Sequence, residues 1–204
     1  MMNITPKQID KAKRIFCQHG GILRTAKAIN AGIQPRALYA MRNSGELQML
    51  RRGCYRLTEL GSMSQPDLAV AAKAVPQGVV CLISALAFHE ITTQIPHHVD
   101  MAIPAHRHCP KIDYPPIQSY WFSGTAYEEG VETHNLDGVD VRIYCPAKTV
   151  ADCFKYRNKI GLDVAMEALK FCRQRKRTSV QEFLKFAKIC RVSKIIAPYL
   201  EAIL

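Results

Sequence analysis

The sequence of residues 24–57 is RTAKAINAGIQPRALYAMRNSGELQMLRRGCYRL, and its glycines and proline divide it into four short elements. A first helix covers about residues 24–30 and ends before Gly32. A second helix begins at Pro35, which the first turn of a helix tolerates, and ends before Gly45, a residue type common just beyond a helix. Two short helices joined by a tight glycine-containing turn are typical of a helix-turn-helix.

A β-hairpin is predicted directly after the second helix. Residues 47–50 and 54–57 have the composition of strands, and a turn that contains Arg51, Arg52 and Gly53 joins them. A hairpin in this position is a wing, so the segment predicts a winged helix-turn-helix. The returning strand carries a third arginine, Arg56.

A further helix precedes this segment. Thr5 is a suitable N-cap, Pro6 fits the first helical position, and Gln8 completes a capping box. Apolar residues at helical spacing continue this helix to about Gln18. We therefore predict a separate N-terminal domain over residues 1–62.

The helix that begins at Pro35 has an apolar and a polar face. Leu38 and Met41 would face inward, and Ile33 and Leu47 would close the small core. The opposite face then presents Arg36, Tyr39, Ala40 and Asn43. Arginine and asparagine hydrogen-bond the edges of guanine and adenine in the major groove of DNA, and a small alanine allows close approach.

The charge of the N-terminal domain indicates a polyanionic partner. Residues 1–62 contain 11 Lys and Arg against 3 Asp and Glu, a net charge of +8. Arg24, Thr25 and Lys27, near the start of the preceding helix, suit phosphate contacts, as do the wing arginines. A small helical cap with solvated charges is the alternative, but three helices, a wing and this charge together favour nucleic-acid binding.

Residues 67–204 form a second predicted domain after a short polar connection at 62–66. The predicted strands are residues 79–82, 99–103, 118–122, 131–136 and 139–144. The main predicted helices follow at residues 148–156, 163–175, 179–190 and 195–203. The whole chain is thus α+β: a winged helix-turn-helix and then a mixed α/β domain, strands first and helices after.

The basic helices of the second domain leave three interpretations open. Residues 63–154 have a net charge of −5, whereas residues 155–194 have a net charge of +9. The helices could form a second nucleic-acid surface, a docking surface for an acidic protein, or ordinary solvated faces.

The sequence contains little evidence of a catalytic site. No acid-x-Lys triplet lies between Asp100 and Asp152, and the chain has neither a glycine-rich phosphate loop nor a GxSxG turn. A packed helix explains Ser84, His89 and Glu90 better than a nucleophile and its base do. We predict no enzyme and no cofactor.

A metal site and a membrane location are equally unsupported. None of the eight cysteines belongs to a CxxC pair, and the histidines around residues 97–98 and 106–108 fit a polar loop better than a metal site. No apolar run is long enough to span a bilayer, and the first residues contain no apolar signal region. We expect no membrane contact and a cytoplasmic location.

Four stretches in order connect the sequence to a known family. They are GGILRTA at residues 20–26, RGCYRL at 52–57, ISALAFH at 83–89 and PAKTVAD at 146–152. Together they resemble the AbiEi-type antitoxins of type IV toxin–antitoxin systems. The resemblance implies a repressor that binds inverted repeats in the promoter of its own operon, as double-stranded DNA.

The resemblance also implies a role for the second domain, a partner for it, and the positions that face DNA. Residues 67–204 would counteract a nucleotidyltransferase-like toxin without needing a stable complex, in phage defence by abortive infection. The resemblance assigns no chemical role to Asp152, which we expect simply to tie the start of its helix to the preceding hairpin. The positions expected to face DNA are Arg24, Thr25, Gln34, Arg36, Tyr39, Arg42 and Asn43, with Arg51, Arg52 and Arg56 on the wing.

Two other classes of function remain as alternatives. The second domain could be a nucleic-acid-processing enzyme that the first domain targets to DNA. It could also be an interaction module whose basic helices dock on RNA or an acidic protein.

Overall fold

A computed structural model describes residues 5–60, 65–110, 112, 114–136, 138–175 and 178–203, apart from the side chains of residues 51, 60 and 203. Residues 62–64 of the predicted connection and Asp137 of the predicted hairpin turn lie outside these ranges. The chain divides into two compact units. Unit 1 comprises Met1–Val70 with Asn135–Val139, and unit 2 comprises Ala71–His134 with Asp140–Leu204.

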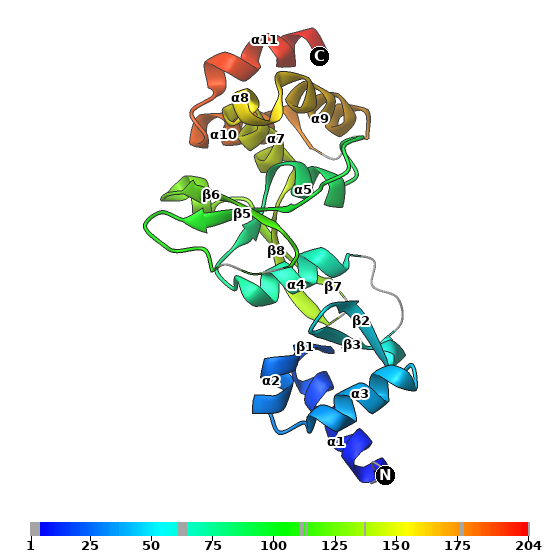
Figure 1. Cartoon of the computed structure of the whole chain (residues 1–204). Helices are drawn as coiled ribbons and strands as arrows, with labels where there is room; N and C mark the ends of the chain where they lie inside the picture. The colour runs from blue at the N-terminus through cyan, green and yellow to red at the C-terminus, as the bar shows by residue number, and fades with distance from the viewer. Residues whose placement is uncertain are drawn as a thin grey trace. The chain divides into compact units, whose positions relative to one another are not determined.

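Helices precede a mixture of strands and helices along the chain, as the sequence predicts (Figure 1). Unit 1 contains α1 (Pro6–Gln18), β1 (Ile22–Arg24), α2 (Thr25–Asn30), α3 (Pro35–Asn43), β2 (Leu47–Arg51), β3 (Cys54–Leu57) and the short 3-10 helix η1 (Thr58–Leu60). Its three strands form an antiparallel sheet in the order β1-β3-β2.

Capping residues and glycines in the sequence determine where most of these helices and strands begin and end. The predicted capping box of α1 is confirmed, because the N–H of Thr5 donates to Oε1 of Gln8 at 3.0 Å. Gly45, with φ of +79°, follows α3 in a conformation that favours glycine. Strand β1 was not predicted. Arg24, expected to start the helix over residues 24–30, is instead the last residue of β1 and the N-cap of α2.

The core of unit 1 forms where the apolar stripes of its helices meet the sheet. Leu38 and Met41 of α3 are buried, together with Ile33 and Leu47, as predicted. Phe16 of α1 packs into the same cluster. Burying one such side chain contributes about 1.5–3 kcal/mol, so this small core fixes the rotation of α3 about its own axis.

Unit 2 is built on a mixed five-stranded sheet. Its strands are β4 (Val79–Val80), β5 (Val99–Pro104), β6 (Ile117–Phe122), β7 (Val131–Leu136) and β8 (Val139–Tyr144), in the spatial order β6-β5-β4-β8-β7. Strand β5 runs parallel to β6 and antiparallel to β4, and β4 runs parallel to β8. The predicted strand at 79–82 is shorter than expected, because Leu82 already begins a helix.

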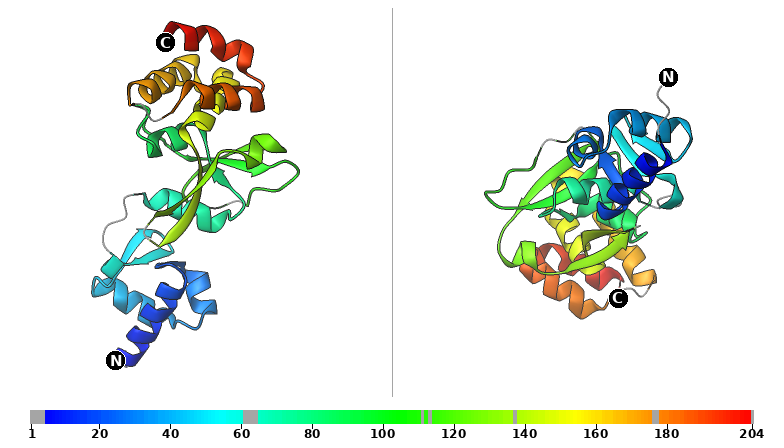
Figure 2. Two further views of the ribbon diagram at one scale, coloured as in Figure 1. Left: turned by 180° about the vertical axis from the view of Figure 1, so that it is seen from behind. Right: turned by 90° about the horizontal axis from the view of Figure 1, so that it is seen from below.

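Helices gather on one side of this sheet, with α7 among α9, α10 and α11 (Figures 1 and 2). Helix α4 (Pro66–Ala74) crosses the division between the units. The remaining helices are α5 (Leu82–Phe88), α6 (Thr125–Glu128), α7 (Pro146–Lys155), α8 (Arg157–Ile160), α9 (Leu162–Gln174), α10 (Val180–Ile189) and α11 (Ser193–Ile203). The sequence did not predict α6 and α8, since a helix of four residues has no periodicity to detect.

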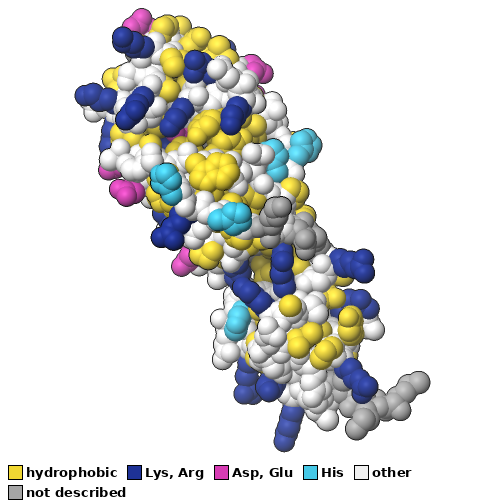
Figure 3. Space-filling model, turned by 60° about the vertical axis from the view of Figure 1, so that its left-hand side comes forward, with side chains coloured by type: hydrophobic (Ala, Val, Ile, Leu, Met, Phe, Trp, Pro, Cys, Tyr) yellow, Lys and Arg dark blue, Asp and Glu magenta, His cyan; other side chains and the backbone are white. Residues whose placement is uncertain are grey.

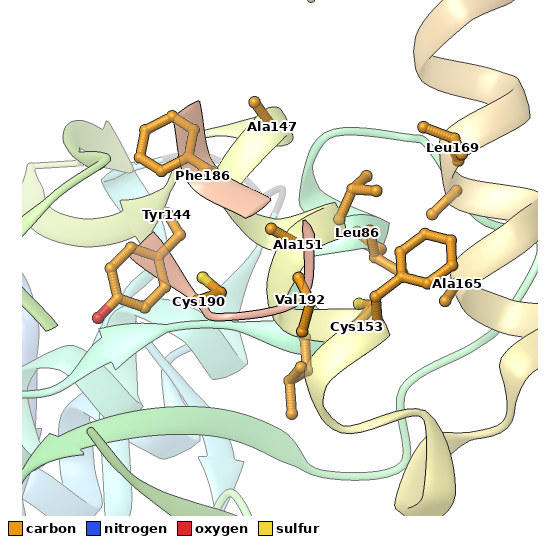
Figure 4. Packing of buried hydrophobic residues seen from close by; sticks show 14 of the residues in the cluster. Leu86, Tyr144, Ala147, Ala151, Cys153, Ala165, Leu169, Phe186, Cys190 and Val192 are labelled. Carbon is orange, nitrogen blue, oxygen red and sulfur yellow. The ribbon is translucent and has the colours of Figure 1, made fainter. Parts of the chain in front are cut away.

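An ion pair lies inside the core of unit 2. Lys148 and Asp152, one turn apart on α7, are paired and both 0% exposed. The Lys148 ammonium also lies 4.1 Å from the ring centroid of Tyr144. Asp152 accepts a second bond from the thiol of Cys190 at 3.2 Å, in the cluster shown in Figure 4. The predicted link from Asp152 to the hairpin differs from the structure, in which its two oxygens bond Lys148 of the same helix and Cys190 after α10.

Truncating the core face of α3 tests this packing. Leu38→Ala should lower the free energy of unfolding of unit 1 by about 2–5 kcal/mol, because a large-to-small change leaves a cavity. Amide hydrogen exchange in α3 measures the loss. Tyr39→Ala, the exposed neighbour on the same helix, is the control and should change stability little. Equal effects of the two substitutions would contradict the assigned rotation of α3.

Candidate functional site

The outer face of α3 presents a stripe of polar side chains. Arg36, Tyr39 and Asn43 are exposed at positions i, i+3 and i+7, which lie on one side of a helix, and Tyr39 is 49% exposed. Ala40 is half-buried beside them. Arg42 is also exposed. The structure thus brings together the α3 residues that the sequence placed at a nucleic-acid surface.

Arg42 organises its neighbours within this stripe. Its Nε and Nη2 donate to Oδ1 of Asn43 at 3.2 and 3.0 Å. Its guanidinium carbon lies 5.5 Å from the ring centroid of Tyr39, within cation–π range. These contacts restrict the rotamers of all three side chains, which reduces the entropy that a ligand-bound arrangement would cost.

The start of α2 is attached to the β2–β3 turn. The backbone N–H and the hydroxyl of Thr25 both donate to the carbonyl oxygen of Gly53, at 2.9 and 3.3 Å. Arg24 pairs with Cys54 across the β1–β3 ladder. Two segments that are separate in sequence therefore lie together: the start of α2, and the turn that contains Arg52.

The other predicted positions are distributed around these two segments. Lys27 and Arg52 are exposed, and Arg24 and Thr25 are half-buried. Gln34 is the exposed N-cap of α3, and its Oε1 accepts a bond from Gln8 of α1 at 3.4 Å. The side chain of Arg51 lies outside the described part of the structure.

Arg56 differs from its prediction. It is only 1% exposed, so its guanidinium cannot face a ligand at the surface of unit 1. Arg56 belongs to β3, the central strand of the sheet, between β1 and β2. Arg56 alternates with the core residues Tyr55 and Leu57, which places it on the opposite face of the sheet.

An ion-pair network supports the loop between α3 and β2. The ammonium of Lys13 on α1 pairs with Glu46 at 2.9 Å and also with Glu59. The bond from Lys13 lowers the pKa of Glu46 below its ordinary value, which shows that the pair favours the ionised form. The network connects α1 to the residues at both ends of the hairpin.

Sequence reasoning missed a basic stripe on α1. Lys7, Lys11 and Arg14 are exposed at positions i, i+4 and i+7 and therefore share one side of the helix. Lys11 reaches the α2–α3 turn, where its Nζ would lie 3.8 Å from a Cβ at Gly32. The helical spacing of these basic residues in the sequence could have predicted the stripe.

One known family resembles the N-terminal part of the chain. The family model that matches is described as "Transcriptional regulator, AbiEi antitoxin", and it matches residues 5–58. Residues 5–58 are therefore similar to the AbiEi antitoxin family of transcriptional regulators. The predicted resemblance is confirmed over this quarter of the chain, and the family suggests a regulatory, non-enzymatic role.

A solved structure resembles nearly the whole chain. The RV2827C protein from Mycobacterium tuberculosis superposes with a TM-score of 0.58, and the match covers 92% of this chain and 73% of that protein. The two sequences are 10% identical, so the likeness concerns the fold. A search among curated proteins finds no match.

Outside the AbiEi match, the polar residues considered for catalysis have structural partners. Buried Asp100 accepts bonds from the N–H of Ser84 at 3.2 Å and from its hydroxyl at 3.4 Å, and its Oδ1 lies 3.0 Å from Nε2 of His98. Burial raises the pKa of Asp100. His89 bonds the carbonyl oxygen of Tyr144 instead. Ser84 and His89 thus have separate partners rather than forming a nucleophile and base.

Within the described ranges, no group of three or more His, Cys, Asp or Glu side chains is arranged to hold a metal ion. Every helix in the described part of the chain is too short or too polar to cross a membrane.

The attachment of α2 to the turn can be tested at Thr25. Thr25→Val removes the hydroxyl bond to Gly53 but keeps the shape of the side chain, and should lower the stability of unit 1 by about 0.5–1.5 kcal/mol. Amide exchange at position 25 should accelerate accordingly. Thr25→Ser, which keeps the hydroxyl, should stay close to the original protein. Identical exchange in the valine variant and the original protein would remove this bond from the account.

Proposed function

We propose that residues 5–58 form a winged helix-turn-helix that binds double-stranded DNA. Helix α3 would enter the major groove, and the β2–β3 wing and the start of α2 would contact the phosphate backbone. The exposed stripe of α3 carries this proposal, because it combines arginine and asparagine on a helix whose other face is buried. The net charge of +8 over residues 1–62 adds the required attraction to phosphate.

The contacts can be divided by chemistry. Arg36 and Asn43 would hydrogen-bond base edges, with Tyr39 beside them and Arg42 holding Asn43 in place. The phosphate contacts would come from residues on α2, the N-cap of α3 and the wing: Arg24, Thr25, Lys27, Gln34, Arg51 and Arg52. Arg56 has no place in this interface because it is buried.

We further propose that the protein represses its own operon and acts as an antitoxin. The AbiEi family match over residues 5–58 supports a regulator of this kind. The operator would contain inverted repeats, and residues 67–204 would form the antitoxin domain that counteracts a nucleotidyltransferase-like toxin. A stable complex with that toxin is not required. The repressor would act in the cytoplasm, where the DNA is.

Two substitutions separate base recognition from phosphate binding. Asn43→Ala should weaken binding to the protein's own promoter by about 1–3 kcal/mol and leave binding to a scrambled duplex unchanged. Arg52→Ala should weaken binding to both duplexes equally and reduce the salt slope by about 1. Fluorescence anisotropy titrations at several salt concentrations measure both effects.

Asn158→Ala, at an exposed position of α8 in unit 2, is the matched control and should bind both duplexes as the original protein does. The proposed interface is wrong if Asn43→Ala and Asn158→Ala behave alike on the promoter fragment.

A further inference from the structure

A concave pocket lies within unit 2, away from the elements assigned to DNA. It lies among the segment between β6 and α6, the end of α7, α8, and the turn between α10 and α11. Its volume is about 470 Å³, which falls in the range of small-ligand sites. Nothing in the proposed regulatory function uses this pocket.

Three cationic side chains line the pocket. They are Lys155, at the end of α7, Arg157, at the start of α8, and Arg191, in the turn after α10. No carboxylate belongs to the lining in the described part of unit 2. Three like charges around one cavity repel each other, so an anion inside it would be stabilised by all three.

Backbone contacts constrain two of these residues. Nη1 of Arg157 donates to the carbonyl oxygen of Phe154 at 3.0 Å, which anchors its guanidinium. Arg191 has a φ of +60°, an uncommon conformation for a residue with a side chain. Its N–H donates to Lys188 at 3.1 Å, and the next N–H donates to Ala187 at 2.8 Å. These bonds fix the backbone of the turn from which Arg191 lines the pocket.

Hydroxyl groups complete a set of donors for a phosphate. Ser123 and Thr125 are exposed and also line the pocket. Gly124 between them has a φ of +52°, which turns the chain at this point. Lysine, arginine and hydroxyl side chains are the groups that bind phosphate oxygens in proteins.

The remaining wall is apolar. Ile189, Val192 and Ile195 supply aliphatic surface against which a sugar or base could pack. Cys190 contributes to the lining, and its thiol bonds Asp152. The buried Lys148 neutralises that carboxylate, so Asp152 does not cancel the charge of the pocket's cations.

We propose that this pocket binds a small phosphorylated ligand of the size of a mononucleotide. The cations and hydroxyls would hold the phosphate, and the aliphatic wall would contact the organic part. A nucleic-acid backbone is less suited to it, because a duplex presents its phosphates along an open surface rather than inside a cavity of this volume. Figure 3 shows Lys and Arg side chains around hydrophobic surface on a face of unit 2.

Calorimetric titration of the full chain tests the ligand class. Inorganic phosphate, adenosine monophosphate and adenosine serve as probes. We expect both phosphate compounds to bind, the nucleotide more tightly, and adenosine to bind at least about ten-fold more weakly than the nucleotide, because charged hydrogen bonds are lost. Absence of nucleotide binding at millimolar concentration, or equal binding of adenosine, would overturn the proposal.

Substitutions in the pocket locate the binding. Arg191→Asn removes the charge but keeps a residue type that tolerates positive φ, and Lys155→Gln removes the charge from an exposed helix end. Each should weaken nucleotide binding by about ten-fold or more. Lys170→Gln, at an exposed position of α9 outside the lining, is the matched control and should have no effect.

Two further outcomes would contradict the proposal. One is nucleotide binding that stays unchanged in both pocket variants while circular dichroism shows them folded. The other is competition by a single-stranded oligonucleotide. If the oligonucleotide displaces the nucleotide equally well from the original protein and from Arg191→Asn, the binding takes place on a diffuse nucleic-acid surface. Trp121, the one tryptophan of the chain and two residues before Ser123, offers an independent fluorescence signal.

Discussion

The one-sided burial of α3 is the constraint on which the proposed interface depends. Leu38 and Met41 are held in the core of unit 1, and a residue step rotates a helix by about 100°. With these two side chains inside, Arg36, Tyr39 and Asn43 must point outward. A rotation that buried the arginine or the asparagine without partners would cost several kcal/mol, so the apolar core itself selects the surface that faces a ligand.

Unit 2 depends on a different constraint, the buried pair of Lys148 and Asp152. Removing each charge from water costs several kcal/mol, and the loss is offset only while the two remain paired and bonded. Tyr144 and Cys190 supply the additional contacts. Since Cys190 immediately precedes Arg191, the pair also fixes the turn that forms one rim of the cationic pocket. The buried ion pair in the core thus helps to position the charged side chain of Arg191 at the surface.

Local chemistry made much of unit 1 predictable. Proline and glycine mark the ends of α3, and helical spacing separates its core face from its exposed face. Arg56 was misplaced because an arginine close to a predicted hairpin turn is ordinarily solvated, and only the folded unit shows that it is buried. Lys148 gave no sign of being buried, since a lysine on a helix is ordinarily solvated. The cationic pocket was invisible for a similar reason: only the fold brings Ser123, near β6, beside Arg191, beyond α10.

The central claim is that the AbiEi-like unit recognises its own promoter, and one titration tests it most directly. The full chain would be titrated against the DNA upstream of its own gene and against a scrambled duplex of equal length and composition, at two salt concentrations. We predict tighter binding to the promoter at both salt concentrations, because base contacts persist when phosphate attraction is screened. Equal affinities that fall together as salt rises would contradict sequence-specific repression.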